Sequence, residues 1–171
     1  MSSRNSQTIT IRPYVATDAS TLVSLFRASV REIASRDYTA SQIRAWAPDH
    51  IDGGRLGQEC ASRPTWIAEV EGRIAGFSDL EPDGHVDMLY VHPDFQRRGV
   101  ARALLMHIEK AARAAGLRRL YTEASITARP VFEAMGFRTI APQTVTVGGV
   151  PMMNYRMERC LESPVPASRS R

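Results

Sequence analysis

Alternating hydrophobic and polar positions predict that the chain folds into short strands and helices in a mixed order. A two-residue period indicates strands at 8–12, 65–70, 74–80, 85–91, 120–124, 139–147 and 152–158. Helical spacing indicates helices at 17–33, 38–46, 52–62, 100–115 and 128–135. The resulting order is strand, helices, three strands, helix, strand, helix and two strands, which predicts a mixed α/β layer fold.

The length and composition predict one domain. The chain has 171 residues, of which 43% are hydrophobic, enough for a single sizeable core. We expect residues 1–7 to be loose, 8–160 to form the domain, and 161–171, rich in proline and serine, to be a disordered tail. No signal-peptide pattern and no apolar run of transmembrane length occur, and two cysteines do not make a disulfide framework or a zinc site. We therefore expect a cytoplasmic protein without a membrane anchor.

The basic residues exclude several chemistries. Of 22 basic residues only Lys110 is a lysine, and it falls in an alanine-rich amphipathic stretch. This argues against Schiff-base and pyridoxal-phosphate enzymes, which need a lysine amine with a lowered pKa. No glycine precedes a lysine, so the chain has no Walker A loop and is not a P-loop kinase or ATPase. The net charge of +4 favours acidic ligands without implying nucleic acid.

The loop at 91–101 carries the clearest candidate chemistry, because it joins a strand to the start of a helix. Backbone N–H groups at such a place have no intrahelical partner and face a positive helix dipole, so they bind anions. Gly99 lets the backbone approach a ligand closely, and Ala101 keeps the helix start open. Three arginines add positive charge, namely Arg97, Arg98 and Arg102. A pyrophosphate is the expected ligand, whereas a solvated basic loop is the alternative.

Two motifs resemble those of a known family. Gln96, Gly99 and Ala101 form Q-x-x-G-x-A after Tyr-Val-His-Pro, which resembles the acetyl-CoA loop of the GCN5-related N-acetyltransferases (GNAT superfamily). The segment 128–137, ARPVFEAMGF, is similar to the A-x-x-F-Y-E-x-x-G-F segment of that family. The element order fits as well, so the resemblance covers about residues 8–158. It implies a mixed, mostly antiparallel sheet with helices on both faces.

The resemblance also implies the reaction and its co-substrate. In this family an amine attacks the thioester of acetyl-CoA directly, and two splayed strands, here around 88–91 and 122–125, admit the pantetheine arm. Backbone groups at 89–91 are expected to hold that arm and polarise the thioester carbonyl. The residues implied to bind acetyl-CoA are Leu89, Tyr90, Val91, Gln96, Arg97, Arg98, Gly99, Val100, Ala101, Arg102, Ser125, Arg129 and Phe132.

The proton-transfer groups are open at this stage. His85 and Asp87 are two residues apart, so an unbroken strand would point both to one face. The resemblance favours Asp87 as the general base, with His85 second, acting directly or through a water. Phe132 stands where the family often has a tyrosine acid, which leaves Tyr155 as a substitute. That tyrosine could equally be a half-buried strand residue, and a thiol with a pKa of about 8.5 leaves tolerably without an acid.

The acceptor pocket is expected between the first helices and the final strands. The candidate residues are Tyr38, Trp46, Asp49, Met152, Met153 and Asn154, with the further carboxylates Glu81 and Glu123. Trp46 could also be a core anchor. His85, Asp87 and His92 are metal-ligand types, but their positions argue against a shared site, so no metal is expected.

Three functions remain as hypotheses. The first is an acetyl-CoA-dependent N-acetyltransferase that acts on a small-molecule or amino-acid-like amine. The second is a CoA-binding sensor without turnover, which the Phe132 departure makes thinkable. The third is an acetyltransferase for a protein or an aminoacyl-tRNA, suggested by the basic pI. No RNA-recognition motif accompanies that charge. A homodimer is a reasonable expectation from the resemblance.

Overall fold

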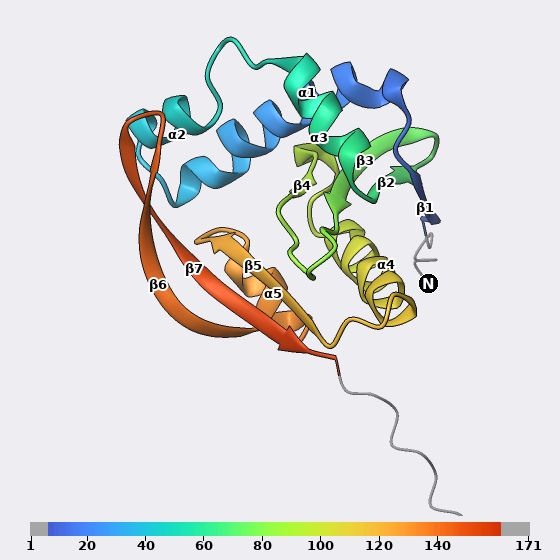
Figure 1. Ribbon diagram of the computed structural model, residues 1–171. Helices are drawn as coiled ribbons and strands as arrows, with labels where there is room; N and C mark the ends of the chain where they lie inside the picture. The colour runs from blue at the N-terminus through green and yellow to red at the C-terminus, as the bar shows by residue number, and fades with distance from the viewer. Residues whose placement is uncertain (1–6, 162–171) are drawn as a thin grey trace, which may run out of the picture.

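Two antiparallel sheets form the framework of the computed structural model, which describes residues 7–161 (Figure 1). The first sheet has the order β1 (Ile9–Pro13), β2 (Thr65–Val70), β3 (Arg73–Asp79) and β4 (Leu89–Val91). The second has the order β5 (Arg119–Ser125), β7 (Val150–Cys160) and β6 (Arg138–Val147). The predicted loose terminus and disordered tail lie almost entirely outside the described residues.

Helices cover both faces of the first sheet, which confirms the predicted fold class. The helices of the described residues are η1 (Ala16–Asp18), α1 (Ala19–Ala28), η2 (Ser29–Ile33), η3 (Ala34–Arg36), α2 (Ala40–Trp46), α3 (Gly53–Ser62), η4 (Pro93–Phe95), α4 (Val100–Ala114) and α5 (Arg129–Ala134). Of these, α2 and α5 pack against the second sheet. Side-chain caps explain two starts: Thr39 accepts a hydrogen bond from the Gln42 N–H at 3.3 Å, and Asp52 accepts one from the Arg55 N–H at 3.0 Å. Within residues 7–161 no helix is long and apolar enough to span a bilayer.

Helix α4 packs against both sheets and joins their cores. Its residues Val100 and Leu104 pack with Ala75 of β3, whereas Leu105 and Ile108 pack in the core that contains Leu120 of β5. Helices α1 and α3 cover the opposite face of the first sheet. The β6–β7 hairpin curves past β5 to α2 (Figure 1), where buried Met152 packs in one cluster with residues of η2 and α2.

The predicted strand at 85–91 is wrong in its first half, and this difference opens the site. Val86 N–H donates to Tyr121 O of β5 at 2.9 Å, so the segment begins beside the second sheet. Three residues later β4 pairs with β3 of the first sheet instead. The segment therefore changes sheets between Val86 and Leu89. After the isolated bridge between His85 and Tyr121, no strand pairing joins β4 to β5, so a gap opens between these two strands.

The first long helix also differs from the prediction of one regular helix to Ile33. The α-helical part ends at Ala28, and residues Ser29–Ile33 form a π-helical turn. Such turns are rare and are often found at functional sites. Here Ser29, Val30 and Ile33 line the gap between β4 and β5.

Candidate active site

The β4–α4 loop has the geometry of an anion site. Gly99 has φ of +82°, a left-handed conformation that favours glycine, and Arg97 is also left-handed at +60°. The first α4 amide to bond back to the loop is that of Ala103, to Gly99 O at 2.9 Å. The N–H groups at 100–102 therefore precede the first helical bond and suit an oxyanion. Gln96 braces the loop, because its Nε2 donates to Val91 O at 3.1 Å.

Two hollows meet at this loop. One runs along the loop and α5 and is lined by Arg97, Gly99, Val100, Arg102 and Pro130 among others. The other lies in the gap between β4 and β5 and is lined by Leu89, Tyr90, Ser125 and Phe132 among others. Val91, Gln96 and Ala101 line both. A phosphate at the loop and an extended chain entering the gap therefore fit one continuous path, as acetyl-CoA requires.

Four residues expected near the cofactor or the reaction line neither hollow within the described part of the chain, namely His85, Arg98, Arg129 and Tyr155. Arg98 donates to Gln7 Oε1 at 3.1 Å and lies over the Phe95 ring. Arg129 pairs with Glu133 at 2.7 Å, and its guanidinium lies 4.2 Å from the centroid of the Tyr155 ring. Tyr155 is thus turned toward α5, on the face of the second sheet opposite Glu123, since the two belong to adjacent register pairs.

The inner end of the gap, where an acceptor would lie, is apolar with an acidic edge. Ser29, Val30, Ile33, Ala34 and Trp46 line its helical side. On the strand side, Asp87 and Glu123 are the only charged residues among the described ones that line this hollow. We name this part of the gap the acceptor pocket. A cationic amine with an apolar body matches its lining.

Two of the other residues expected around the acceptor, Tyr38 and Asp49, have structural partners. The Tyr38 hydroxyl donates to Met153 O at 2.7 Å and accepts from the Ile126 N–H at 2.9 Å, which ties the connection between η3 and α2 to the second sheet. Asp49 pairs with Arg31 at 2.8 Å. Asn154 does not line the pocket, although its buried Oδ1 has no hydrogen-bond partner in the structure.

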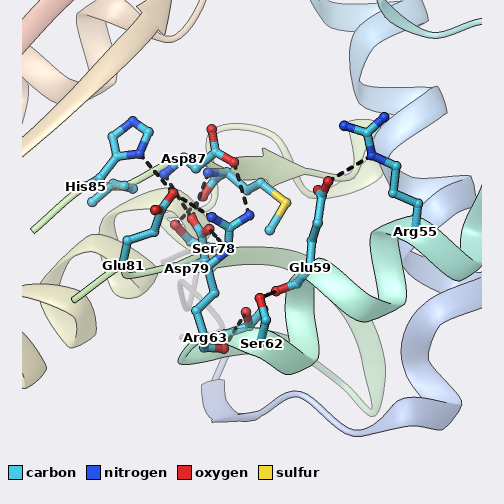
Figure 2. Close-up of polar contacts among 12 residues, drawn as sticks. Arg55, Glu59, Ser62, Arg63, Ser78, Asp79, Glu81, His85 and Asp87 are labelled. Atoms are coloured by element: carbon cyan, nitrogen blue, oxygen red, sulfur yellow. Dashed lines mark hydrogen bonds and ion pairs between the residues drawn. The ribbon is translucent and has the colours of Figure 1, made fainter. Parts of the chain in front are cut away.

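Arg63 gathers three carboxylates beside the acceptor pocket (Figure 2). Its Nη1 donates to Glu81 Oε1 at 2.5 Å and its Nη2 to Asp87 Oδ2 at 3.2 Å. Its Nε lies 3.0 Å from Asp79 Oδ2, an ion pair without hydrogen-bond geometry. The Asp79 side chain is fully buried, whereas the Asp87 side chain is 43% exposed. We name Arg63, Asp79, Glu81, His85, Asp87 and Glu123 the acidic cluster.

His85 joins two members of this cluster and does not line the pocket itself. Its Nδ1 lies 3.0 Å from Glu81 Oε1 and its Nε2 2.5 Å from Glu123 Oε2. Its ring stacks on Tyr121 at a centroid distance of 4.8 Å. His85 and Asp87 are thus near each other as predicted, but through the turn that precedes β4 and not through a continuous strand.

Burial and partners shift the pKa values of the cluster. Burial raises the pKa of Asp87, against the opposing attraction of Arg63 and His85. Burial likewise raises the pKa of Asp79 to about 6, although a backbone hydrogen bond from Met88 and the charge of Arg63 oppose it. For His85, burial lowers the pKa, but hydrogen bonds to Glu123 and Glu81 outweigh it, and the net shift is upward. A carboxylate with a raised pKa is a stronger base.

The cluster also contains a set of metal-ligand types. Ligand atoms of Glu81, His85 and Asp87 lie within 4.8 Å of one another. The guanidinium of Arg63, however, already contacts both Glu81 and Asp87. This cation supplies the positive charge that a metal would bring.

Among the charged residues of the site, sequence reasoning missed Arg63 and Asp79. Asp79 lies next to the end of the predicted strand at 74–80, among otherwise apolar and small residues, where a charge destined for full burial would have been a signal. Arg63 follows a predicted helix and precedes Pro64, and nothing in that pattern distinguishes it from the other arginines of the chain.

Comparisons with known proteins agree with this geometry. A family model described as an acetyltransferase (GNAT) domain matches residues 34–159. The uncharacterized N-acetyltransferase YafP of Escherichia coli K12 is 38% identical over 150 residues, a match that covers 87% of this chain and 94% of that protein.

Solved structures support the same assignment. A GCN5-related N-acetyltransferase from Rhodopseudomonas palustris, described as an aminotransferase of class II, has a TM-score of 0.86 and 35% identity, with 90% of this chain and 96% of that chain covered. The PaiA N-acetyltransferase of Thermoplasma acidophilum, in complex with coenzyme A, has a TM-score of 0.75 at 19% identity, with 90% and 99% covered, and shows likeness of fold. With the gap between β4 and β5 and a glycine-containing loop at the start of α4, the chain belongs to the GCN5-related N-acetyltransferase superfamily and is an acetyl-CoA-dependent N-acetyltransferase.

Proposed function

We propose that this enzyme acetylates the primary amine of a small molecule, bound in the acceptor pocket, by direct attack on the thioester. The observation that carries the proposal is the pairing of an apolar lining with two carboxylates, Asp87 and Glu123, next to β4. An amine reaches this pocket as an ammonium ion, which the two carboxylates attract. The helical side then holds the apolar body of the acceptor.

Asp87 is the proposed general base and Glu123 is the second candidate. Bound acetyl-CoA supplies an activated acetyl thioester. Asp87 accepts the proton of the ammonium ion, which frees the nitrogen lone pair for attack. Backbone N–H groups around β4 are suited to stabilise charge that develops on the carbonyl oxygen. As the C–N bond forms, the C–S bond of the thioester breaks and CoA leaves as its thiolate, which then takes up the second proton of the nitrogen. A thiol with an ordinary pKa of about 8.5 needs little help as a leaving group. Tyr155 is not given this role because it packs under Arg129.

The pocket lining also favours one kind of small amine. None of the described residues that line the acceptor pocket is cationic. An amino acid brings a carboxylate that would lie near Asp87 and Glu123 without a partner, at a cost in binding. We therefore expect amines without a carboxylate to be preferred over their amino-acid counterparts.

The test measures acceptor-dependent release of free thiol with matched pairs of amines. Phenethylamine and tryptamine should react with a higher kcat/KM than phenylalanine and tryptophan. Faster reaction of the amino acids would contradict the preference, and tight acetyl-CoA binding without thiol release for any amine would favour the sensor. Asp87→Asn should lower kcat/KM about 100-fold with unchanged acetyl-CoA affinity. Glu71→Gln, an exposed acid in the β2–β3 turn, is the control and should have no effect.

A further inference from the structure

Arg63 is well placed to control Asp87, because it is mostly buried and binds three acids at once. Its side chain is 14% exposed, and each of its three nitrogens contacts a different carboxylate, as Figure 2 shows. A guanidinium holds its donors in a rigid fork, so fixing one contact restricts the other two. The direction of the Asp87 carboxylate is therefore coupled to Asp79 and Glu81.

Asp79 extends this coupling to the backbone at the edge of the gap. Its Oδ1 accepts hydrogen bonds from the N–H groups of Asp87 at 3.0 Å and Met88 at 2.7 Å. Ser78 Oγ donates to Met88 O at 2.5 Å. Side chains at the end of β3 thus replace strand pairing where the chain leaves β5. The buried carboxylate of Asp79 accepts these hydrogen bonds, and its negative charge is paired with the guanidinium of Arg63.

We propose that Arg63 is a positioning residue for acetyl transfer, which aims the Asp87 carboxylate at the acceptor pocket and keeps it ionised there. The inference rests on the proposed role of Asp87 as the base. Arg63, which lies between α3 and β2, would thereby affect proton transfer at the start of β4 through its contacts with Asp79, Glu81 and Asp87.

The charges around Asp87 show why an arginine is needed. The charged and titratable groups that act on it are Glu59, Arg63, Asp79, Glu81 and His85. Three of these are acids, and each favours the protonated form of Asp87. His85 shares its two nitrogens between Glu81 and Glu123, so Arg63 is the cation that contacts Asp87 directly. Without it, Asp87 would keep its proton at a higher pH and would accept none from the acceptor.

Carboxyl NMR titration of the full-length protein tests the electrostatic part without relying on activity. With ¹³C-labelled aspartate, the Asp87 signal is identified by its loss in Asp87→Asn. Arg63→Gln should raise the titration midpoint of Asp87 by about one pH unit. Arg63→Lys keeps the charge but not the planar guanidinium, and should raise the Asp87 midpoint by less. If Arg63→Gln does not fold, the measurement is made with Arg63→Lys alone. Arg138→Gln, which breaks a pair between an exposed arginine of β6 and Glu158 of β7, is the control and should leave the midpoint in place.

Kinetics test the positioning part. In Arg63→Gln the acidic limb of the kcat/KM profile should move to higher pH and kcat should fall about tenfold, with the KM for acetyl-CoA unchanged. In an Asp87→Asn background the same substitution should have little further effect. An unmoved Asp87 midpoint and acidic limb, or losses that simply add in the double variant, would overturn the proposal. Full activity of Asp87→Asn would instead overturn the assignment of Asp87 as the base. In that case a raised midpoint in Arg63→Gln would show that Arg63 keeps Asp87 ionised but that catalysis does not depend on it.

Discussion

The β4–α4 loop and the acidic cluster carry opposite charges, and they are built in opposite ways. The loop lies within residues 91–102, and the polar groups that it offers are backbone N–H groups and exposed arginines. The cluster takes one side chain from the α3–β2 junction, one from the end of β3, three from the turn before β4 and one from β5. A contiguous backbone site needs little tertiary support, whereas a side-chain site exists only after both sheets have formed.

Burial widens this difference. Arg97 and Arg102, the loop arginines that line a hollow, are exposed, so an interaction of either with a ligand would be screened by water and salt. Arg63 and Asp79 are removed from solvent, where charges interact strongly and the loss of one partner is costly. Substitution of a single side chain should therefore have a mild effect on function in the loop, unless it disturbs the loop backbone, and a severe effect in the cluster.

The largest effect is expected from Gly99→Glu, which disturbs the backbone of the loop itself. The added carboxylate repels the phosphates of acetyl-CoA, and the side chain must adopt the left-handed conformation of Gly99. That conformation alone costs a residue with a side chain about 1–2 kcal/mol. We expect acetyl-CoA affinity, measured by isothermal titration calorimetry, to fall more than about 100-fold, or about 2.7 kcal/mol.

Gly99→Ala separates strain from charge. A Cβ at this position meets only the Ile9 Cδ1 atom, at 3.9 Å, so space is not limiting. Alanine should therefore weaken binding far less than glutamate. Equal affinities of Gly99→Glu and the parent enzyme would show that the diphosphate does not lie at this loop.

The sequence predicted the loop well because its signals are local. The end of the strand is marked by Pro93, and the start of the helix by Gly99 and the apolar spacing of α4. The N–H groups without an intrahelical partner follow from that boundary. The β2–β3 hairpin and α5 were also confirmed, since their turns and caps depend on near neighbours. Both motifs of the family resemblance lie in such segments.

The cluster was predicted only in part because its members meet through long-range packing. Asp87 and His85 were singled out, yet on a continuous strand that does not exist, since nothing local shows that 84–86 pairs with β5 while 89–91 pairs with β3. Arg63 lies 24 residues from Asp87 in the chain. No periodicity links two such positions, and the π-helical turn at Ser29–Ile33 has no local signature either.

A smaller effect, on stability, is expected from His85→Gln. The pKa of His85 is raised in the folded protein, because hydrogen bonds to Glu123 and Glu81 outweigh burial. Its protonated form therefore stabilises the fold fully below the unfolded pKa of about 6.5, and this contribution is lost as the pH rises through the folded pKa. Urea unfolding should show a loss of about 1–2 kcal/mol at pH 6 that shrinks by pH 9.

His50→Gln is the matched control, because His50 is exposed in the α2–α3 connection. It should change the free energy of unfolding little at either pH. A loss in His85→Gln that is equal at pH 6 and pH 9 would mean that His85 acts in the cluster by packing on Tyr121 and not by its charge.

The smallest effect is expected from Arg102→Gln in the loop. Arg102 is exposed and lines the hollow beside α4, so its attraction for phosphate should be worth about 0.5 kcal/mol, or about a twofold to threefold change in acetyl-CoA affinity. Raising the salt concentration to 0.5 M should abolish the difference from the parent enzyme. Arg118→Gln is the control, since Arg118 is exposed beyond the far end of α4, about 22 Å along the helix from the loop. A tenfold, salt-independent loss in Arg102→Gln would show that this arginine is held as rigidly as Arg63 and would remove the contrast between the two sites.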